Sequence, residues 1–291
     1  MHERHRRIRM PRPPAHGRVG PAHVAHRVAA MILRRVVGHL GRQDWTAVAI
    51  ELVVVVLGVF IGLQASNWNE QWEIDAKAAH FAESLKADMR AEAWGYEYQI
   101  HYYGNVLSNA ERAVDVLAGD APLSDEALLI SAFRATQYNE NIRRRATYDE
   151  LTSTGSIGLI RDRVLRETAM RLYNTNNLNN IVQEGRSSPY RRAFRMAVPN
   201  DAQSRLEKAC GDRVAVIGDY RTNFTDAINY PCATGLPADA IAASAAALRR
   251  DPELVPLLRL RVADLQSDVA NLLVYEGDIH TALRGYMEEP R

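Results

Sequence analysis

The strongest pattern along the chain is one uninterrupted apolar run. From Thr46 to Ala65 the sequence reads TAVAIELVVVVLGVFIGLQA, in which Glu51 is the one ionisable residue. Twenty residues of helix rise about 30 Å, which matches the hydrocarbon thickness of a bilayer. Tryptophan rings, which favour the two membrane–water interfaces, flank the run at Trp45, Trp68 and Trp72. We therefore predict a transmembrane helix over residues 45–66.

The two sides of this run differ in charge, which indicates an orientation. Residues 1–45 hold ten Arg and two acidic residues, whereas residues 66–90 hold three basic and five acidic residues. Basic flanks stay on the cytoplasmic side of a membrane. We expect a single-pass protein of the bacterial inner membrane with a cytoplasmic N-terminus and residues 67–291 in the periplasm.

Two other interpretations of the run stay open. A core helix of a soluble protein has a similar composition, and a cleaved signal peptide is a second alternative, with a cut after Ala65. Leu63 stands where such cleavage sites prefer a small residue, and the run is longer than a usual signal-peptide core.

The N-terminal segment before the run predicts no packed structure. Residues 1–30 lack apolar periodicity and contain five of the nine His. We expect residues 1–44 to be a basic, largely disordered cytoplasmic tail. Metal binding by these histidines is an alternative, although their spacing is irregular, and a translation start at Met31 is another.

One face of the predicted membrane helix indicates association with a second helix. Its members recur at alternating intervals of four and three residues: Glu51, Val55, Gly58, Gly62 and Ala65. The two glycines form a G-x-x-x-G pair, which lets helices approach closely, and a carboxyl group in a membrane needs a polar environment. This pattern predicts a homo-oligomer or a complex with another membrane subunit. The alternative is a protonated or interface-reaching Glu51 beside incidental glycines.

Residues 67–291 are expected to form an all-α antiparallel bundle. Apolar residues at helical spacing from Ile74 predict a helix that leaves the membrane and ends near Gly119–Pro122. A second helix is expected over Asp125–Tyr138, a third from a capping box at Thr147–Glu150, and a fourth capped by Asp162. No alternation of apolar and polar residues indicates a sheet.

A single C-terminal helix is predicted from one apolar stripe. The stripe comprises Leu258, Val262, Leu265, Val269, Leu272, Ile279 and Leu283. Glu276 is its polar interruption, and the Asn-rich stretch YNTNNLNN at residues 173–180 is a polar break elsewhere in the helical region.

Two sequence stretches resemble a family of uncharacterised bacterial single-pass inner-membrane proteins. The first stretch has an acidic residue early in the span, a V-G-x-x-I-x-L-Q core that is matched from the glycine onward, and an N-W-N-E motif after the span. The matching residues are Glu51, Gly58, Ile61, Leu63, Gln64, Asn67, Trp68, Asn69 and Glu70. The second comprises Tyr148, Leu151, Gly155, Leu159, Ile160, Leu165 and Arg166. The resemblance implies the membrane topology and carries no activity.

The two cysteines, Cys210 and Cys232, favour a disulfide, because an even count outside the cytoplasm typically pairs. It would close a loop of about 22 residues, worth roughly 3 kcal/mol in the chain-entropy model. Two buried free thiols are the alternative.

Composition excludes several classes of protein. The chain is 47% hydrophobic and 24% charged with a net charge of +1, and the basic N-terminal segment leaves the remainder at −7. These values exclude a disordered chain and a uniformly basic nucleic-acid binder. No P-loop, dinucleotide, zinc-protease or nucleophile-elbow motif occurs, so no catalytic residue, cofactor or metal site is predicted.

Two groups of arginines are candidates for binding an anion or anionic lipid. They are Arg143, Arg144 and Arg145 beside TSTGSIG, and Arg186, Arg191, Arg192 and Arg195 around SSPYRRAFR. Solvated basic faces are the alternative for both groups.

Three classes of function remain open. The first is a membrane-tethered interaction or scaffold subunit, which accounts for the anchor, the helices and the missing catalytic motif. The second is a ligand-sensing module that signals through a partner, because the cytoplasmic segment holds no output domain. The third is an enzyme with an unrecognised site.

Overall fold

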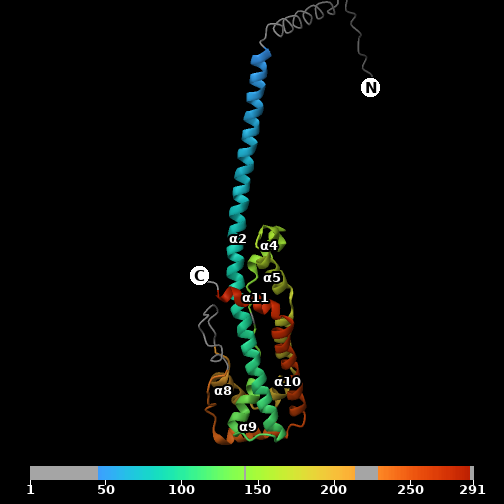
Figure 1. Cartoon of the computed structure of the whole chain (residues 1–291). Helices are drawn as coiled ribbons and strands as arrows, with labels where there is room; N and C mark the ends of the chain where they lie inside the picture. The colour runs from blue at the N-terminus through green and yellow to red at the C-terminus, as the bar shows by residue number, and fades with distance from the viewer. Residues whose placement is uncertain (1–44, 141, 214–228, 289–291) are drawn as a thin grey trace, which may run out of the picture. The chain divides into compact units, whose positions relative to one another are not determined.

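The computed structural model describes residues 45–140, 142–213 and 229–288, and all regular structure in these ranges is helical, without a strand. The predicted tail, residues 1–44, lies outside the described residues. In chain order the elements (Figure 1) are α2 Trp45–Ala118, α3 Asp125–Arg134, α4 Ala146–Ser153, η1 Ser156–Leu159, α5 Arg163–Asn174, α6 Asn177–Ser187, α7 Pro189–Ala197, α8 Asn200–Cys210, α9 Ala238–Arg250, α10 Leu254–Ala270, η3 Asn271–Tyr275 and α11 Gly277–Glu288.

The longest element is α2, a helix of 74 residues. It passes through both units into which the chain divides, one ending at Gln71 and the other beginning at Trp72. The helix continues without a break past Gly95 and Gly104 and is followed by Gly119, with a φ of +88°, where the sequence predicted its end. Only glycine adopts this left-handed conformation without steric cost, so Gly119 fixes the end of the helix.

The first part of α2 is apolar and uncovered. Residues 49–74 are all exposed, and among the described residues α2 is the one helix long and apolar enough to cross a membrane. None of its most apolar window is buried by the rest of the structure. The helix thus occupies the predicted place, and its apolar surface has no protein partner within the described chain.

In the second unit, α2 provides the central apolar face. Buried residues begin at Ala78 and Phe81 and continue through Tyr103 and Ala113. Ile74 is 38% exposed, so the buried face begins one turn later than the periodicity predicted. Around this face, α3 contacts α8 and α9, α7 contacts α6, α9 and α10, and α11 contacts α5.

The predicted C-terminal helix is two α-helices joined by the π-helical turn η3. Leu258, Leu265, Leu272, Ile279 and Leu283 of the predicted stripe are all buried. The prediction of one regular helix was wrong for a specific reason. The carbonyl of Leu272 accepts a hydrogen bond from the hydroxyl of Tyr96 (2.9 Å), and the N–H of Glu276 donates to Asn271 instead (3.1 Å). This i→i+5 bond widens the turn.

The start of α4 is capped by another helix, so the predicted capping box at Thr147 was wrong. The helix begins at Ala146, and its N-cap residue, Arg145, makes no side-chain capping bond. Carboxylates of α2 accept the N–H groups instead: Asp88 from Thr147 (3.3 Å), and Glu92 from Arg144. In contrast, the predicted cap of α5 is confirmed, since Asp162 accepts from the N–H of Leu165 (3.1 Å).

Candidate functional site

The predicted association face lies on the exposed part of α2. Glu51, Val55, Gly58, Gly62 and Ala65 are all exposed. A Cβ atom built on either glycine would meet no described atom within 4 Å. The face is therefore open to a second helix, and its use as an interface stays a prediction.

The flanking tryptophans are also exposed, at 71% for Trp45, 72% for Trp68 and 77% for Trp72. A helix rises about 35 Å between Trp45 and Trp68, which exceeds the hydrocarbon thickness and places both indoles at interfacial depth if the segment spans a bilayer.

Three of the seven candidate anion-binding arginines already have carboxylate partners. The guanidinium of Arg143 donates to Glu92 (2.7 Å), that of Arg145 contacts Asp149 (2.9 Å), and Arg186 contacts Glu140. Sequence spacing indicates only the pair of Arg145 with Asp149, four residues apart, because the other two acids lie more than 40 residues from their arginines. Arg144 and Arg192 are exposed.

Arg191 and Arg195 are the candidate arginines that line a cavity. This cavity, of about 450 Å³, lies between the chain that follows α3, helix α7 and helix α8. Its charged walls come from Arg191 and Arg195 on α7, Glu207 on α8, and Asp212 just after α8. Tyr138 contributes an aromatic ring. We refer to it as the α7–α8 cavity.

Helix α7 has three arginines and positions two of them, Arg191 and Arg195, at the cavity, because other residues of the helix are anchored in the core. Tyr190 and Phe194 are fully buried, and the hydroxyl of Tyr190 donates to the carbonyl of Ala132 (2.8 Å). Arg191 and Arg195 are four residues apart, so they share a face. Half-buried Arg191 donates to the carbonyl of Thr136 (2.7 Å) and lies over the ring of Tyr138, 4.8 Å from its centroid.

Asp212 is held by a buried tyrosine of α2. The hydroxyl of Tyr102 donates to its carboxylate (2.7 Å). Although Asp212 is exposed as a residue, the groups packed around its carboxylate exclude part of the solvent. This desolvation, together with the nearby charge of Glu207, raises the pKa of Asp212 to about 6, while Tyr102, Arg134 and Arg191 oppose the rise. Desolvation lowers the pKa of Arg191, with the neighbouring Arg195 adding to the effect. Perturbed acids and bases within one cavity are typical of functional sites.

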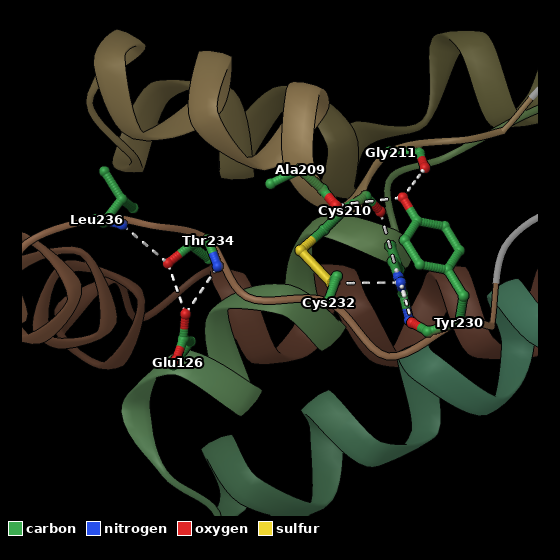
Figure 2. Close-up of a disulfide and its surroundings, with 9 residues drawn as sticks. Glu126, Ala209, Cys210, Gly211, Tyr230, Cys232, Thr234 and Leu236 are labelled. Atoms are coloured by element: carbon green, nitrogen blue, oxygen red, sulfur yellow. Dashed lines mark hydrogen bonds between the residues drawn. A yellow bond between two sulfur atoms is a disulfide. The ribbon is translucent and has the colours of Figure 1, made fainter.

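A disulfide fixes the chain next to Asp212. Cys210 and Cys232 are bonded, with their Cα atoms 5.5 Å apart, which is the pairing that the sequence favours (Figure 2). Buried Arg134 binds both sides of the bridge, donating to the carbonyl of Tyr230 (2.9 Å) and to the carbonyl of Cys210 (3.4 Å). No pattern in the sequence indicates this arginine, because its partners lie 76 and 96 residues away.

Further contacts around the disulfide hold both of its arms. The hydroxyl of Tyr230 donates to the carbonyl of Gly211 (2.6 Å), as Figure 2 shows. Beyond Cys232, one carboxylate oxygen of Glu126 accepts from the N–H (2.8 Å) and the hydroxyl (2.7 Å) of Thr234. These bonds lower the pKa of Glu126. Asp212 therefore follows a segment fixed by covalent and hydrogen bonds.

A second polar cluster joins two anomalies of the sequence. Glu276, the polar interruption of the C-terminal stripe, is buried and contacts the Asn-rich stretch. It accepts from the hydroxyl of Tyr96 (2.8 Å), the amide of Asn177 (3.0 Å) and the hydroxyl of Thr175. Because every partner is provided by the fold and the cluster is closed, we assign it to structure rather than to binding.

Among the residues of the described ranges, no group of three or more His, Cys, Asp or Glu is placed to hold a metal ion. No protein-family model matches the chain, and neither a curated protein nor a solved structure is significantly similar to it. The resemblance of the spanning segment to an inner-membrane family consequently stays a prediction.

Proposed function

We propose that this protein is a single-pass protein of the bacterial inner membrane whose helical unit lies in the periplasm and serves as an interaction or scaffold subunit. One observation carries the proposal: the apolar part of α2 is unburied along its whole length. In water, such a surface is unfavourable, and a lipid bilayer is the environment that matches its length and composition.

Two further observations support the orientation. The ten arginines before the span favour a cytoplasmic N-terminus. The disulfide of the second unit suits an oxidising compartment.

Protease added to spheroplasts tests the orientation. The second unit should be digested while an epitope on the N-terminus stays protected. Digestion of the N-terminal epitope in intact spheroplasts would reverse the orientation, and release of an intact soluble unit would show that the span is a cleaved signal peptide.

We further propose that the protein acts through its spanning helix, on the face of Glu51, Gly58 and Gly62. The two glycines leave a groove for a second backbone, and a partner helix offers the carboxyl group a polar neighbour. Two differently tagged full-length copies should co-purify from solubilised membranes.

Filling the groove tests this interface. Gly58→Ile with Gly62→Ile should abolish co-purification by adding side chains at the contact. Val56→Ile, on another face of the same turn of helix, should leave it intact. Equal co-purification of both variants would show that the face is not the interface.

A second candidate function, a ligand-sensing module, is favoured by the α7–α8 cavity. Helix α2 runs from the tyrosine that binds Asp212 through the proposed span, so it is a continuous element between the cavity wall and the membrane. Disulfide crosslinking between copies through cysteines placed in the span, with and without a bound ligand, tests this candidate. An unchanged crosslinking pattern would exclude signalling through the span.

A further inference from the structure

The α7–α8 cavity has opposite charges on its walls. On α7, Arg191 and Arg195 are four residues apart and share one face of the helix, while α8 contributes the carboxylate of Glu207. Asp212 adds a second carboxylate beside Glu207. The cavity therefore has a cationic wall and an anionic wall.

The charges of the two walls attract each other but are not joined by a direct ion pair. Among the described residues, no ion pair within 4.0 Å joins either arginine to Glu207 or Asp212. Arg191 uses one nitrogen on the carbonyl of Thr136, although a guanidinium has five N–H donors. The side chains of Arg195 and Glu207 make no hydrogen bond to a described residue. As far as the described residues are concerned, donors and acceptors thus stay available on both walls.

We propose that this cavity binds a small zwitterion, a molecule of the size of a short free peptide with one carboxylate and one ammonium group. The carboxylate would accept from Arg191 and Arg195, since guanidinium groups bind carboxylates through paired hydrogen bonds. The ammonium would donate to Glu207 and Asp212, and the ring of Tyr138 would contact the apolar part.

The volume and the rigidity of the walls fit this ligand. A cavity of about 450 Å³ falls in the range of sites for small organic molecules. Arg191 is held by Thr136 and Tyr138, and Asp212 by Tyr102. Such fixed groups lower the entropic cost of binding. The proposal goes beyond the proposed interaction function and does not depend on the orientation in the membrane.

Calorimetric titration of the full-length protein in detergent micelles tests it, with the dipeptide Ala-Phe as the probe. N-acetyl-Ala-Phe lacks the ammonium, and Ala-Phe amide lacks the carboxylate. At pH 7.5 we expect Ala-Phe to bind and each blocked derivative to bind at least about tenfold more weakly, as expected for the loss of one charge-assisted contact.

Two exposed residues allow each end of the ligand to be assigned. Arg195→Gln should weaken the binding of Ala-Phe about tenfold and leave that of the amide unchanged. Glu207→Gln should weaken the binding of Ala-Phe and leave that of the N-acetyl peptide unchanged. Arg192→Gln, an exposed neighbour on α7 that does not line the cavity, is the matched control.

Thermal melts of the three variants establish that each is folded. Three outcomes would overturn the proposal: no binding of Ala-Phe at about 10 mM, equal binding of all three peptides, or equal sensitivity of all three peptides to both substitutions. Because none of these measurements involves co-purification or membrane topology, their failure is distinguishable from failure of the proposed interaction function.

Discussion

The two parts of α2 have the same secondary structure and opposite surroundings. Before Gln71 its apolar side chains are uncovered, with Val55 61% exposed, whereas Leu85 and Met89 in the second unit are fully buried. The difference lies in the side-chain types. Val, Leu, Ile and Gly surround the first part on all sides, which suits lipid. The second part has one apolar face rich in tyrosine, whose hydroxyls need partners within a protein.

The tyrosines of the second part show what that burial requires. Tyr96, Tyr102 and Tyr103 are buried, and each hydroxyl has a hydrogen-bond partner: Glu276 at 2.8 Å, Asp212 at 2.7 Å, and the carbonyl of Asn139 at 3.4 Å. Burial raises the pKa of all three phenols. One helix can thus present a lipid-compatible surface along one stretch and a specifically hydrogen-bonded core along the next.

The largest expected difference between the two parts comes from one substitution made at two places. Leu85→Ala should lower the free energy of unfolding of the second unit by about 3 kcal/mol, because it leaves a cavity in the core. Leu57→Ala, on the exposed part of the same helix, should leave it unchanged. Chemical denaturation in detergent micelles, followed by tryptophan fluorescence, measures both; similar losses would mean that Leu57 is also packed.

Removing the disulfide should have a comparable effect confined to the second unit. Cys210→Ser with Cys232→Ser opens a loop with a sequence separation of 22 and should cost roughly 3 kcal/mol by raising the entropy of the unfolded chain. Reductant should reproduce the loss in the native protein and leave co-purification through the spanning helix unaffected. If reductant abolishes that co-purification, the second unit contributes to the association.

Tyr96→Phe should have a smaller effect, of about 1 to 2 kcal/mol, because it removes one partner from the buried carboxylate of Glu276. Thr175 and Asn177 retain their contacts, which limits the loss. Trp68→Phe, on the exposed part of α2, is the matched aromatic substitution and should leave the unfolding transition in place. An unchanged transition for Tyr96→Phe would indicate that Glu276 is satisfied without the phenol.

Sequence alone predicted the features that depend on local pattern. The helix from Trp45 to Ala118, the end at Gly119 and the cap by Asp162 follow from periodicity, backbone preference and side-chain reach over three residues. The pairing of Cys210 with Cys232 needed only an even count. Each of these signals lies within a short stretch of chain or involves few alternatives.

The features that were missed depend on residues far apart in the chain. Asp88 caps α4 from 59 residues away, and Tyr96 widens the C-terminal helix from 176 residues away. The cavity escaped prediction for the same reason, since Arg191 was grouped with its neighbours in sequence although Asp212 and Tyr138 are its neighbours in space. Tertiary packing brings these distant residues together, and the periodicity of apolar residues along the chain does not predict such contacts.

The smallest expected effect concerns the carboxyl group of Asp268, whose charged form lowers the stability of the fold. Asp268 on α10 is half-buried, one of its oxygens has no partner among the described residues, and Glu184 on α6 faces it. Desolvation, followed by the charge of Glu184, raises the pKa of Asp268 to about 7 from 3.8, against the attraction of Arg261. A native pKa above the unfolded value means that this acid destabilises the fold fully above pH 7, and progressively less as the pH falls toward 4.

Asp268→Asn should therefore stabilise the second unit at pH 8 by about 1 kcal/mol, less than the full pKa shift implies because the side chain keeps some solvent. The amide can donate to Glu184, whereas the carboxylate repels it. At pH 4.5 the gain should be much smaller, since the native carboxyl is then already protonated. Unfolding free energies at the two pH values measure the effect. A loss of stability at pH 8 would show that the attraction between Arg261 and Asp268 outweighs both desolvation and the repulsion by Glu184.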